Sequence, residues 1–177
     1  NNSQTQGTFQ FTSGSESYTL SVLTTAISVY NPSFRFEKSS TDLTGGAPLS
    51  PGDILQYRMN YSNLGNDAST NSRIIDNIPA GTSYRPGSIR INGALMTDAL
   101  DGDQAHYDFA NNRIVYNLGT GATGLAGGEI PASPAAGSSG YVTFEVFIPT
   151  SCAVLSCSGT MRNRARMSYN GKISLSA

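Results

Sequence analysis

Apolar and polar residues alternate along several short stretches of this chain, and no stretch shows the spacing of a capped amphipathic helix. The clearest alternation runs from Leu55 to Tyr61, where Leu, Tyr, Met and Tyr are separated by Gln, Arg and Asn. This period of two places the apolar side chains on one face of a β-strand. The same reasoning predicts further strands at 34–38, 73–78, 88–91, 113–118, 141–148 and 161–169.

Turn-forming residues separate these stretches. Residues that end strands occur at Pro51-Gly52 and Pro79-Ala80-Gly81. Asn-Gly dipeptides, which are typical of hairpin turns, occur at 92–93 and 170–171. A loop rich in Gly, Ala, Ser and Pro covers 119–140. Many short strands with turns between them predict an all-β protein, specifically a β-sandwich.

The two ends of the chain resemble each other. Phe9-x-Phe11, a glycine turn and Tyr18-x-Leu20 are echoed by residues 167–175. This echo predicts that residues 1–32 form an N-terminal β-hairpin, either the tail of a preceding repeat or an attachment segment, and that the main domain spans 33–177. The alternative is that both hairpins belong to a single sandwich.

Charge and composition exclude several classes of function. The net charge is −1, with 11 cationic residues and no basic cluster, which argues against nucleic-acid binding. No apolar run is long enough to span a membrane. One histidine, His106, and few acids leave little material for a catalytic centre, so we expect a non-enzymatic protein. The excess of Ser, Thr, Gly and Asn, with nine Tyr and seven Phe, points to an extracellular one.

Cys152 and Cys157 are the two cysteines, and their C-x4-C spacing suits a small disulfide-closed loop. Such a bond would indicate an oxidising compartment and add about 2 kcal/mol of stability. The alternative is two free thiols on a loop.

Three segments together resemble a known family. P-G-D-I-L-Q-Y-R-M-N-Y at 51–61, I-I-D-N-I-P-A-G-T at 74–82 and N-R-A-R-M-S-Y-N-G at 163–171 are similar to a conserved bacterial surface repeat. This repeat is called domain of unknown function eleven and also occurs in a chlamydial cysteine-rich outer-membrane protein. The resemblance implies an immunoglobulin-like sandwich, usually in tandem, within large secreted or surface-attached proteins and without catalytic activity.

One set of residues predicts covalent chemistry inside the domain. A neutral lysine amine can attack a side-chain amide when a buried carboxyl group assists the proton transfer. Lys38 shares a face with Phe34 and Phe36, Asp76 shares one with Ile74 and Ile78, and Asn163 shares one with Met161 and Met167. These faces otherwise look like core, so we expect a Lys38–Asn163 isopeptide bond with Asp76 as the acid.

The order Lys, Asp, Asn also resembles collagen-adhesin-type stalk domains of surface pilins. Glu145 is the rival acid, but it lies on the face opposite Val142 and Phe144 and is expected to point outward. Lys172 directly follows a turn, which leaves Lys38 as the donor. The alternatives are a hydrogen-bonded polar trio, or a Lys38 whose ammonium reaches solvent at the edge of the sandwich.

An acidic loop is the second candidate site. Asp98, Asp101 and Asp103, with Asp108 nearby, could supply oxygen ligands to calcium, although the EF-hand spacing is missing. The alternative is a solvated acidic turn, in which case the chain binds no cofactor.

These observations favour a structural or stalk repeat module of a secreted bacterial surface adhesin or filament. Its expected partners are neighbouring repeats or filament subunits. The alternative is a carbohydrate- or protein-binding module that uses the 119–140 loop, the acidic loop or the aromatics Tyr84, Tyr107 and Phe109; arginines 162, 164 and 166 could contact an acidic partner or surface polysaccharide. A third possibility is an accessory domain of a secreted enzyme.

Overall fold

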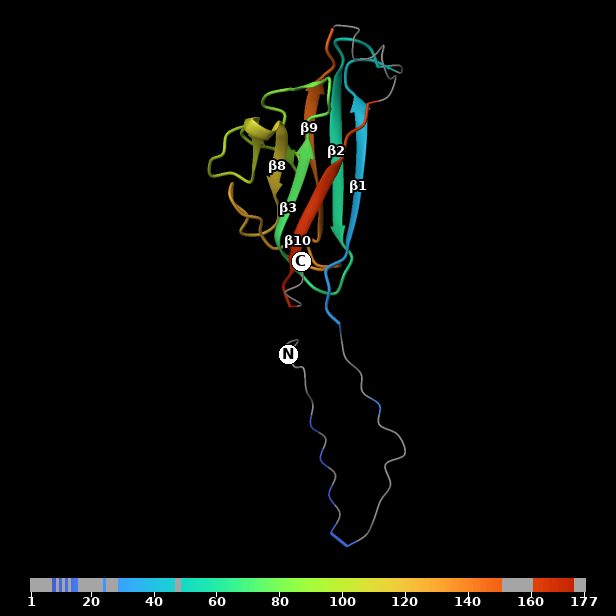
Figure 1. The fold of residues 1–177 in the computed structure, drawn as a ribbon, viewed down its shortest axis with the longest axis vertical. Coiled ribbons are helices and arrows are strands. Elements are labelled where there is room, and N and C mark those ends of the chain that lie inside the picture. The colour runs from blue at the N-terminus through green and yellow to red at the C-terminus, as the bar shows by residue number, and fades with distance from the viewer. Residues whose placement is uncertain are drawn as a thin grey trace.

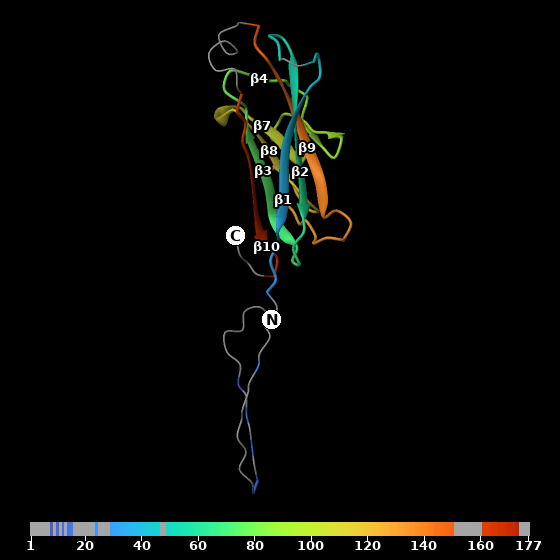
Figure 2. The same cartoon turned by 90° about the vertical axis from the view of Figure 1, so that its right-hand side faces the viewer.

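The fold is a sandwich of two antiparallel sheets, seen face-on in Figure 1 and edge-on in Figure 2. The computed structural model describes residues 29–46, 49–150 and 161–173, with the isolated residues 8, 10, 12, 14, 15 and 24. Apart from those isolated positions and the segment from residue 29 onward, the predicted N-terminal hairpin lies outside the described residues, so its attachment stays a prediction.

The first sheet has the order β1-β2-β9-β5-β6, with β4 also paired to β9. Its strands are β1 (Phe34–Asp42), β2 (Ile54–Asn63), β4 (Ser83–Tyr84), β5 (Arg90–Ile91), β6 (Ala94–Leu95) and β9 (Ser139–Phe147). The second sheet has the order β10-β3-β8-β7 and consists of β3 (Ser69–Asn77), β7 (Ala105–Asp108), β8 (Arg113–Asn117) and β10 (Ala165–Gly171). The 3-10 turn η1 (Phe109–Asn111) joins β7 to β8.

The predicted all-β sandwich is therefore confirmed. The inward faces of both sheets meet in one apolar core, and β2 shows why: its alternate residues Leu55, Tyr57, Met59 and Tyr61 are buried. On β9 the inward residues Val142, Phe144 and Val146 are fully buried. Burial of these faces removes apolar surface from water, which is the main driving force for joining the sheets.

Several sequence-based details were wrong. Asn170-Gly171 is not a hairpin turn, because both residues belong to β10 and pair with Thr70 and Ser69 beyond a register shift. Arg162 and Arg164 lie before β10, which begins at Ala165. The Asn92-Gly93 turn is confirmed: both residues have positive φ, and they join β5 to β6.

The β2–β3 connection holds the chain where it enters and where it leaves the sandwich. On the entering side, Asn66 donates from its backbone to Asn31 and from its side chain to the Val29 carbonyl. On the leaving side, the Lys172 N–H donates to the Ala68 carbonyl. The start of β1 and the end of β10 therefore lie at the same end of the domain, as Figure 1 shows.

Among the described residues, no helix has the length and hydrophobicity required to cross a membrane.

Candidate functional site

Lys38, Asp76 and Asn163 come together between the two sheets. Lys38 lies near the middle of the edge strand β1, opposite Met59 of β2. Asp76 lies on the central strand β3 of the other sheet, opposite Ala165 of β10. Asn163 comes two residues before Ala165 on the same alternating face, so it reaches the region of Asp76.

The Lys38 ammonium contacts Asp76 directly. Lys38 Nζ donates to Asp76 Oδ2, and the Lys38 side chain is 16% exposed whereas that of Asp76 is fully buried. The other carboxylate oxygen, Asp76 Oδ1, is buried and makes no hydrogen bond of good geometry. An ion pair in such surroundings retains little of the hydration that favours charge.

Burial moves both groups towards their neutral forms. Desolvation lowers the pKa of Lys38, and the nearby Asp76 carboxylate only partly opposes this. Desolvation likewise raises the pKa of Asp76, against the opposing effects of Lys38 and of hydrogen bonding from Asn163. With one proton on Asp76, the pair can therefore exist as a neutral lysine amine and a neutral carboxylic acid. Attack on an amide requires this combination.

Asn163 supplies an amide at the same place. It interacts with both Asp76 and the Tyr57 hydroxyl and favours the ionised form of each. Its amide nitrogen is buried but makes no hydrogen bond of good geometry. Lys38, Asp76 and Asn163 thus lie together in a water-poor region.

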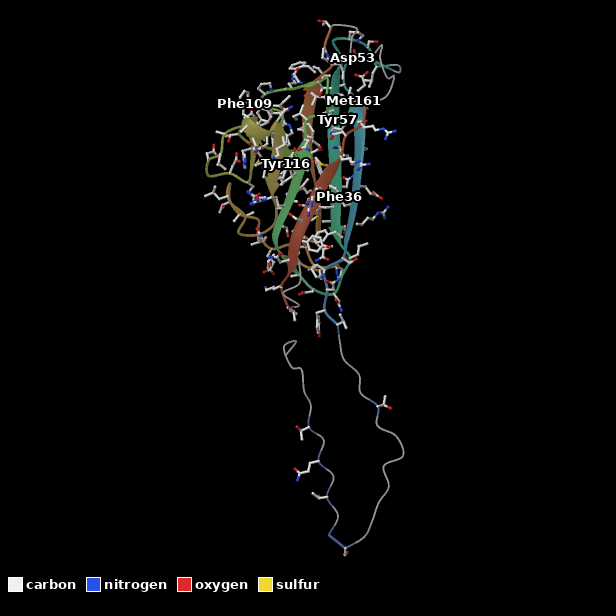
Figure 3. The ribbon with its side chains drawn as sticks, viewed as in Figure 1. Phe36, Asp53, Tyr57, Phe109, Tyr116 and Met161 are labelled. Carbon is white, nitrogen blue, oxygen red and sulfur yellow. The ribbon has the colours of Figure 1, made fainter. Side chains whose placement is uncertain are left out.

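Aromatic rings enclose the lysine. Lys38 Nζ lies 4.7 Å from the centroid of the Tyr57 ring and 6.0 Å from that of Phe144. The two rings are 5.3 Å apart, and Tyr57 also donates its hydroxyl to Met161 Sδ at 3.3 Å; Figure 3 shows Tyr57 beside Met161. The sequence placed Tyr57 on an inward face but gave no sign that it would contact Lys38.

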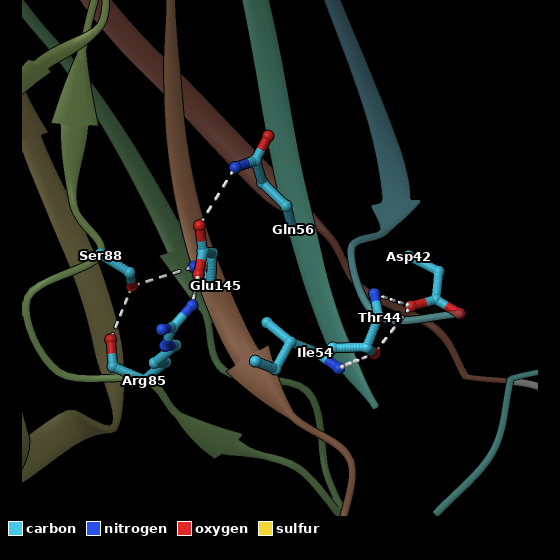
Figure 4. A network of polar contacts seen from close by, with 7 residues as sticks. All are labelled: Asp42, Thr44, Ile54, Gln56, Arg85, Ser88 and Glu145. Carbon is cyan, nitrogen blue, oxygen red and sulfur yellow. Dashed lines mark hydrogen bonds and ion pairs between the residues drawn. The ribbon is translucent and has the colours of Figure 1, made fainter. Parts of the chain in front are cut away.

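The rival acid Glu145 lies elsewhere, as expected. It is on the outer face of β9, where Gln56 Nε2 donates to it at 3.2 Å and Arg85 forms an ion pair with it (Figure 4). Figure 4 also shows Asp42 at the end of β1, where it accepts hydrogen bonds from Thr44. Lys172, the other lysine, pairs with Glu129 at the surface, which is consistent with Lys38 as the donor.

The acidic loop is not arranged as a cation site. Asp98 accepts from the Tyr84 hydroxyl and from the Gly87 N–H at 2.8 Å. Asp101 accepts from Thr97 and from the Asp103 N–H, and Asp103 accepts from the backbone N–H groups of Thr97 and Ala105. Over the part of the chain that the structure describes, no group of three or more His, Cys, Asp or Glu residues could hold a metal ion.

The loop aromatics also differ from expectation. Tyr84 is buried on β4, not exposed at a loop tip. Its ring stacks on Tyr107 with centroids 4.5 Å apart, and Tyr107 meets the edge of Phe109 at 6.1 Å. Only Phe109, 84% exposed, projects into solvent. Cys152 and Cys157 lie outside the described residues, so their disulfide stays a prediction.

The fold resembles domains of bacterial surface proteins. The T6 backbone pilin of serotype M6 Streptococcus pyogenes aligns over 77% of this chain and 29% of its own, with 14% identity and a TM-score of 0.51. The major pilin SpaD from Corynebacterium diphtheriae aligns over 76% of this chain and 30% of its own, with 14% identity and a TM-score of 0.46.

The collagen-binding domain of the Erysipelothrix rhusiopathiae surface protein RspB gives 17% identity and a TM-score of 0.44, over 78% of this chain and 40% of its own. This chain thus spans less than half the length of each of these proteins. No family model matches it, and no curated protein matches it significantly. The likeness to the T6 backbone pilin shows the fold alone, and the similarity to the conserved surface repeat stays a prediction.

Proposed function

We propose that the chain is a non-catalytic structural module of a bacterial cell-surface adhesin or filament, locked by an isopeptide bond between Lys38 and Asn163. The placement of Lys38, Asp76 and the Asn163 amide in one buried cluster carries this proposal. The likeness of fold to the T6 backbone pilin supports it at the level of architecture. Neighbouring repeats or filament subunits are the proposed partners, outside the cell.

The bond-forming step needs no external reagent. The neutral amine Nζ attacks Cγ of Asn163 and gives a tetrahedral intermediate. Asp76 takes a proton from the attacking nitrogen and delivers one to the leaving nitrogen. The Cγ–Nδ2 bond then breaks, one ammonia leaves, and a secondary amide joins the two side chains, with Asp76 returned to its starting state.

The bond would connect the first strand of one sheet to the segment that leads into the last strand of the other. Hydrogen bonds between strands can separate one at a time under load. The covalent amide bond does not separate in this way. A pulling force that reaches Lys38 and Asn163 would thus pass through the covalent bond. This is a mechanical function that needs no substrate.

Intact mass of the purified chain tests the proposal. We expect a mass lower by one ammonia, unchanged by reduction, and a Lys38–Asn163 cross-linked peptide after proteolysis. Lys38→Arg, Asp76→Asn and Asn163→Ala should each restore the full mass. Lys172→Arg is the matched control and should keep the loss, because Lys172 pairs with Glu129 at the surface. A wild-type chain of full mass would overturn the covalent lock.

A second candidate function rests on Phe109. The contacting rings of Tyr84 and Tyr107 support one exposed apolar side chain, Phe109, on a short turn. Such a side chain suits contact with a carbohydrate or protein ligand. A screen of surface polysaccharides with wild type and Phe109→Ala tests this; equal binding by both would count against it.

A further inference from the structure

Tyr57 lies at the centre of the cluster, although the bond-forming step described above does not use it. Its ring faces Lys38 Nζ, and its hydroxyl contacts Met161 and interacts with Asn163, both on the segment before β10. Its present acceptor is the thioether of Met161, and sulfur in a thioether is a weak acceptor. Little energy is therefore lost if the hydroxyl turns to a better acceptor.

The Asn163 amide can supply that acceptor. Asn163 interacts with both Asp76 and the Tyr57 hydroxyl. Its Nδ2 and Asp76 Oδ1 are both buried, and neither makes a hydrogen bond of good geometry. An amide carries its donor and its acceptor on different sides. With Nδ2 turned towards Asp76 Oδ1, the oxygen Oδ1 is left to face the Tyr57 hydroxyl.

We propose that Tyr57 donates its hydroxyl proton in a hydrogen bond to Asn163 Oδ1 and stabilises the oxyanion that forms when Lys38 attacks; this inference rests on the proposed isopeptide bond. The hydroxyl does not transfer its proton, so the balance of the step is unchanged. Negative charge develops on Oδ1 in a region with little water, where a fixed donor has its largest effect.

This arrangement separates two tasks. Asp76 Oδ2 already meets the attacking nitrogen, and Asp76 Oδ1 makes no hydrogen bond of good geometry. With Tyr57 on the amide oxygen, the carboxyl group is left to carry the proton from Nζ to the leaving nitrogen. Burial and the nearby Asp76 raise the pKa of Tyr57 to about 12, so the hydroxyl keeps its proton at any pH at which the domain would work.

Tyr57→Phe tests the inference, because it removes the hydroxyl and keeps the ring over Lys38. Chains are purified in denaturant without the bond, refolded by dilution, and followed by far-ultraviolet circular dichroism for folding and by intact mass for loss of ammonia. We expect Tyr57→Phe to fold normally and then form the bond about 10²-fold more slowly, the usual loss when one donor to an oxyanion is removed.

Tyr61→Phe is the matched control, since Tyr61 is the next inward tyrosine on β2 and lies near Asn92 rather than Asn163. It should react at the wild-type rate. The unfolding free energies of both variants, measured in an Asn163→Ala background, separate effects on the reaction from effects on packing. Similar losses of unfolding free energy in the two variants, with slow bond formation only in Tyr57→Phe, support the proposed role of the Tyr57 hydroxyl.

A wild type that loses ammonia while Tyr57→Phe reacts equally fast would overturn this inference and leave the proposed function intact. A wild type that never loses ammonia would overturn both.

Discussion

Phe34 and Tyr169 stack across the gap between the two sheets, with their ring centroids 4.6 Å apart and their planes tilted by 46°. Phe34 begins β1 and Tyr169 lies near the end of β10, and these strands are not hydrogen-bonded neighbours. The stacked rings and the Lys38–Asp76 contact therefore close the same edge of the sandwich at two separate levels.

The two rings should stabilise each other measurably. We expect a double-mutant cycle of Phe34→Ala and Tyr169→Ala to give a coupling of about 1 kcal/mol in unfolding free energy. The cycle is measured by urea denaturation in the Asn163→Ala background, where no covalent bond masks the contact. Additive effects of the two substitutions would mean that the stack contributes nothing beyond burial.

Loss of the bond should lower stability far more than loss of the amide contact alone. A cross-link between residues 38 and 163 closes most of the domain into a loop and restricts the unfolded chain, which is worth about 5 kcal/mol for a loop of this length. Asn163→Ala should show this difference from wild type in denaturant. The Lys38→Arg variant, which cannot form the cross-link, serves as the reference. Adding Asn163→Ala to this variant should change the unfolding free energy by much less.

The rate of bond formation should fall at both ends of the pH scale. Burial lowers the pKa of Lys38, so its neutral amine is populated at lower pH than that of an exposed lysine, and burial raises the pKa of Asp76, so its acid form persists to higher pH. At low pH the pair gains a second proton and Lys38 is charged. At high pH Asp76 loses its proton and cannot assist.

Refolding is carried out across a pH series, and the mass loss is followed in time. The rate of bond formation should give a bell-shaped pH profile whose two limbs report the coupled titration of Lys38 and Asp76. A rate that rises steadily with pH, without a descending limb, would show that the acid form of Asp76 is not required.

The two candidate acids should behave oppositely. Asp76→Asn should abolish the loss of ammonia and also destabilise the fold by about 3 kcal/mol or more, because Lys38 is left buried without its counter-ion. Glu145→Gln should keep the bond and cost about 1 kcal/mol, because its partner Arg85 is 43% exposed and is not left as a buried, unpaired charge. Intact mass and urea denaturation of both variants decide this. Loss of the bond in Glu145→Gln alone would reverse the assignment.

Asn117 should prove to be a structural residue. It is fully buried, donates to the carbonyls of Thr123 and Gly124 at 2.7 and 2.8 Å, and accepts from Arg73 Nε at 2.8 Å. Asn117→Ala would leave these groups unpaired, and we expect a loss of about 3 kcal/mol in unfolding free energy. The exposed Asn77→Ala is the control, with an expected change within about 0.5 kcal/mol; equal effects would contradict the role of Asn117.

The sequence predicted the parts of this molecule that depend on local periodicity. Alternation identified the inward face of β2 and put Lys38, Asp76 and Asn163 on core faces, because side chains on a strand point alternately to its two sides. It could not show that β1 and β3 lie in different sheets, which is what brings Lys38 to Asp76. Pairing between distant strands is decided by packing, not by local pattern.

The same limit explains Tyr57 and Tyr84. Tyr57 was predicted to point inward, but alternation does not say which inward residues from other strands it meets. Tyr84 lies next to a turn and was expected at the surface, yet the two-residue strand β4 pairs with β9 and turns the ring into the core. Strands this short carry no periodicity from which they could be found.

The β2–β3 connection fixes how tension would enter the domain. Because β1 begins and β10 ends at this one connection, opposed forces on the two strands would peel them away from the same pole rather than slide them past each other. Peeling separates one pair of hydrogen bonds at a time and meets little resistance. With the proposed bond in place, peeling could release β1 only as far as Lys38, and it could release the final segment only back to Asn163. Everything between those two residues would then stay folded under a load that an unlinked sandwich could not hold.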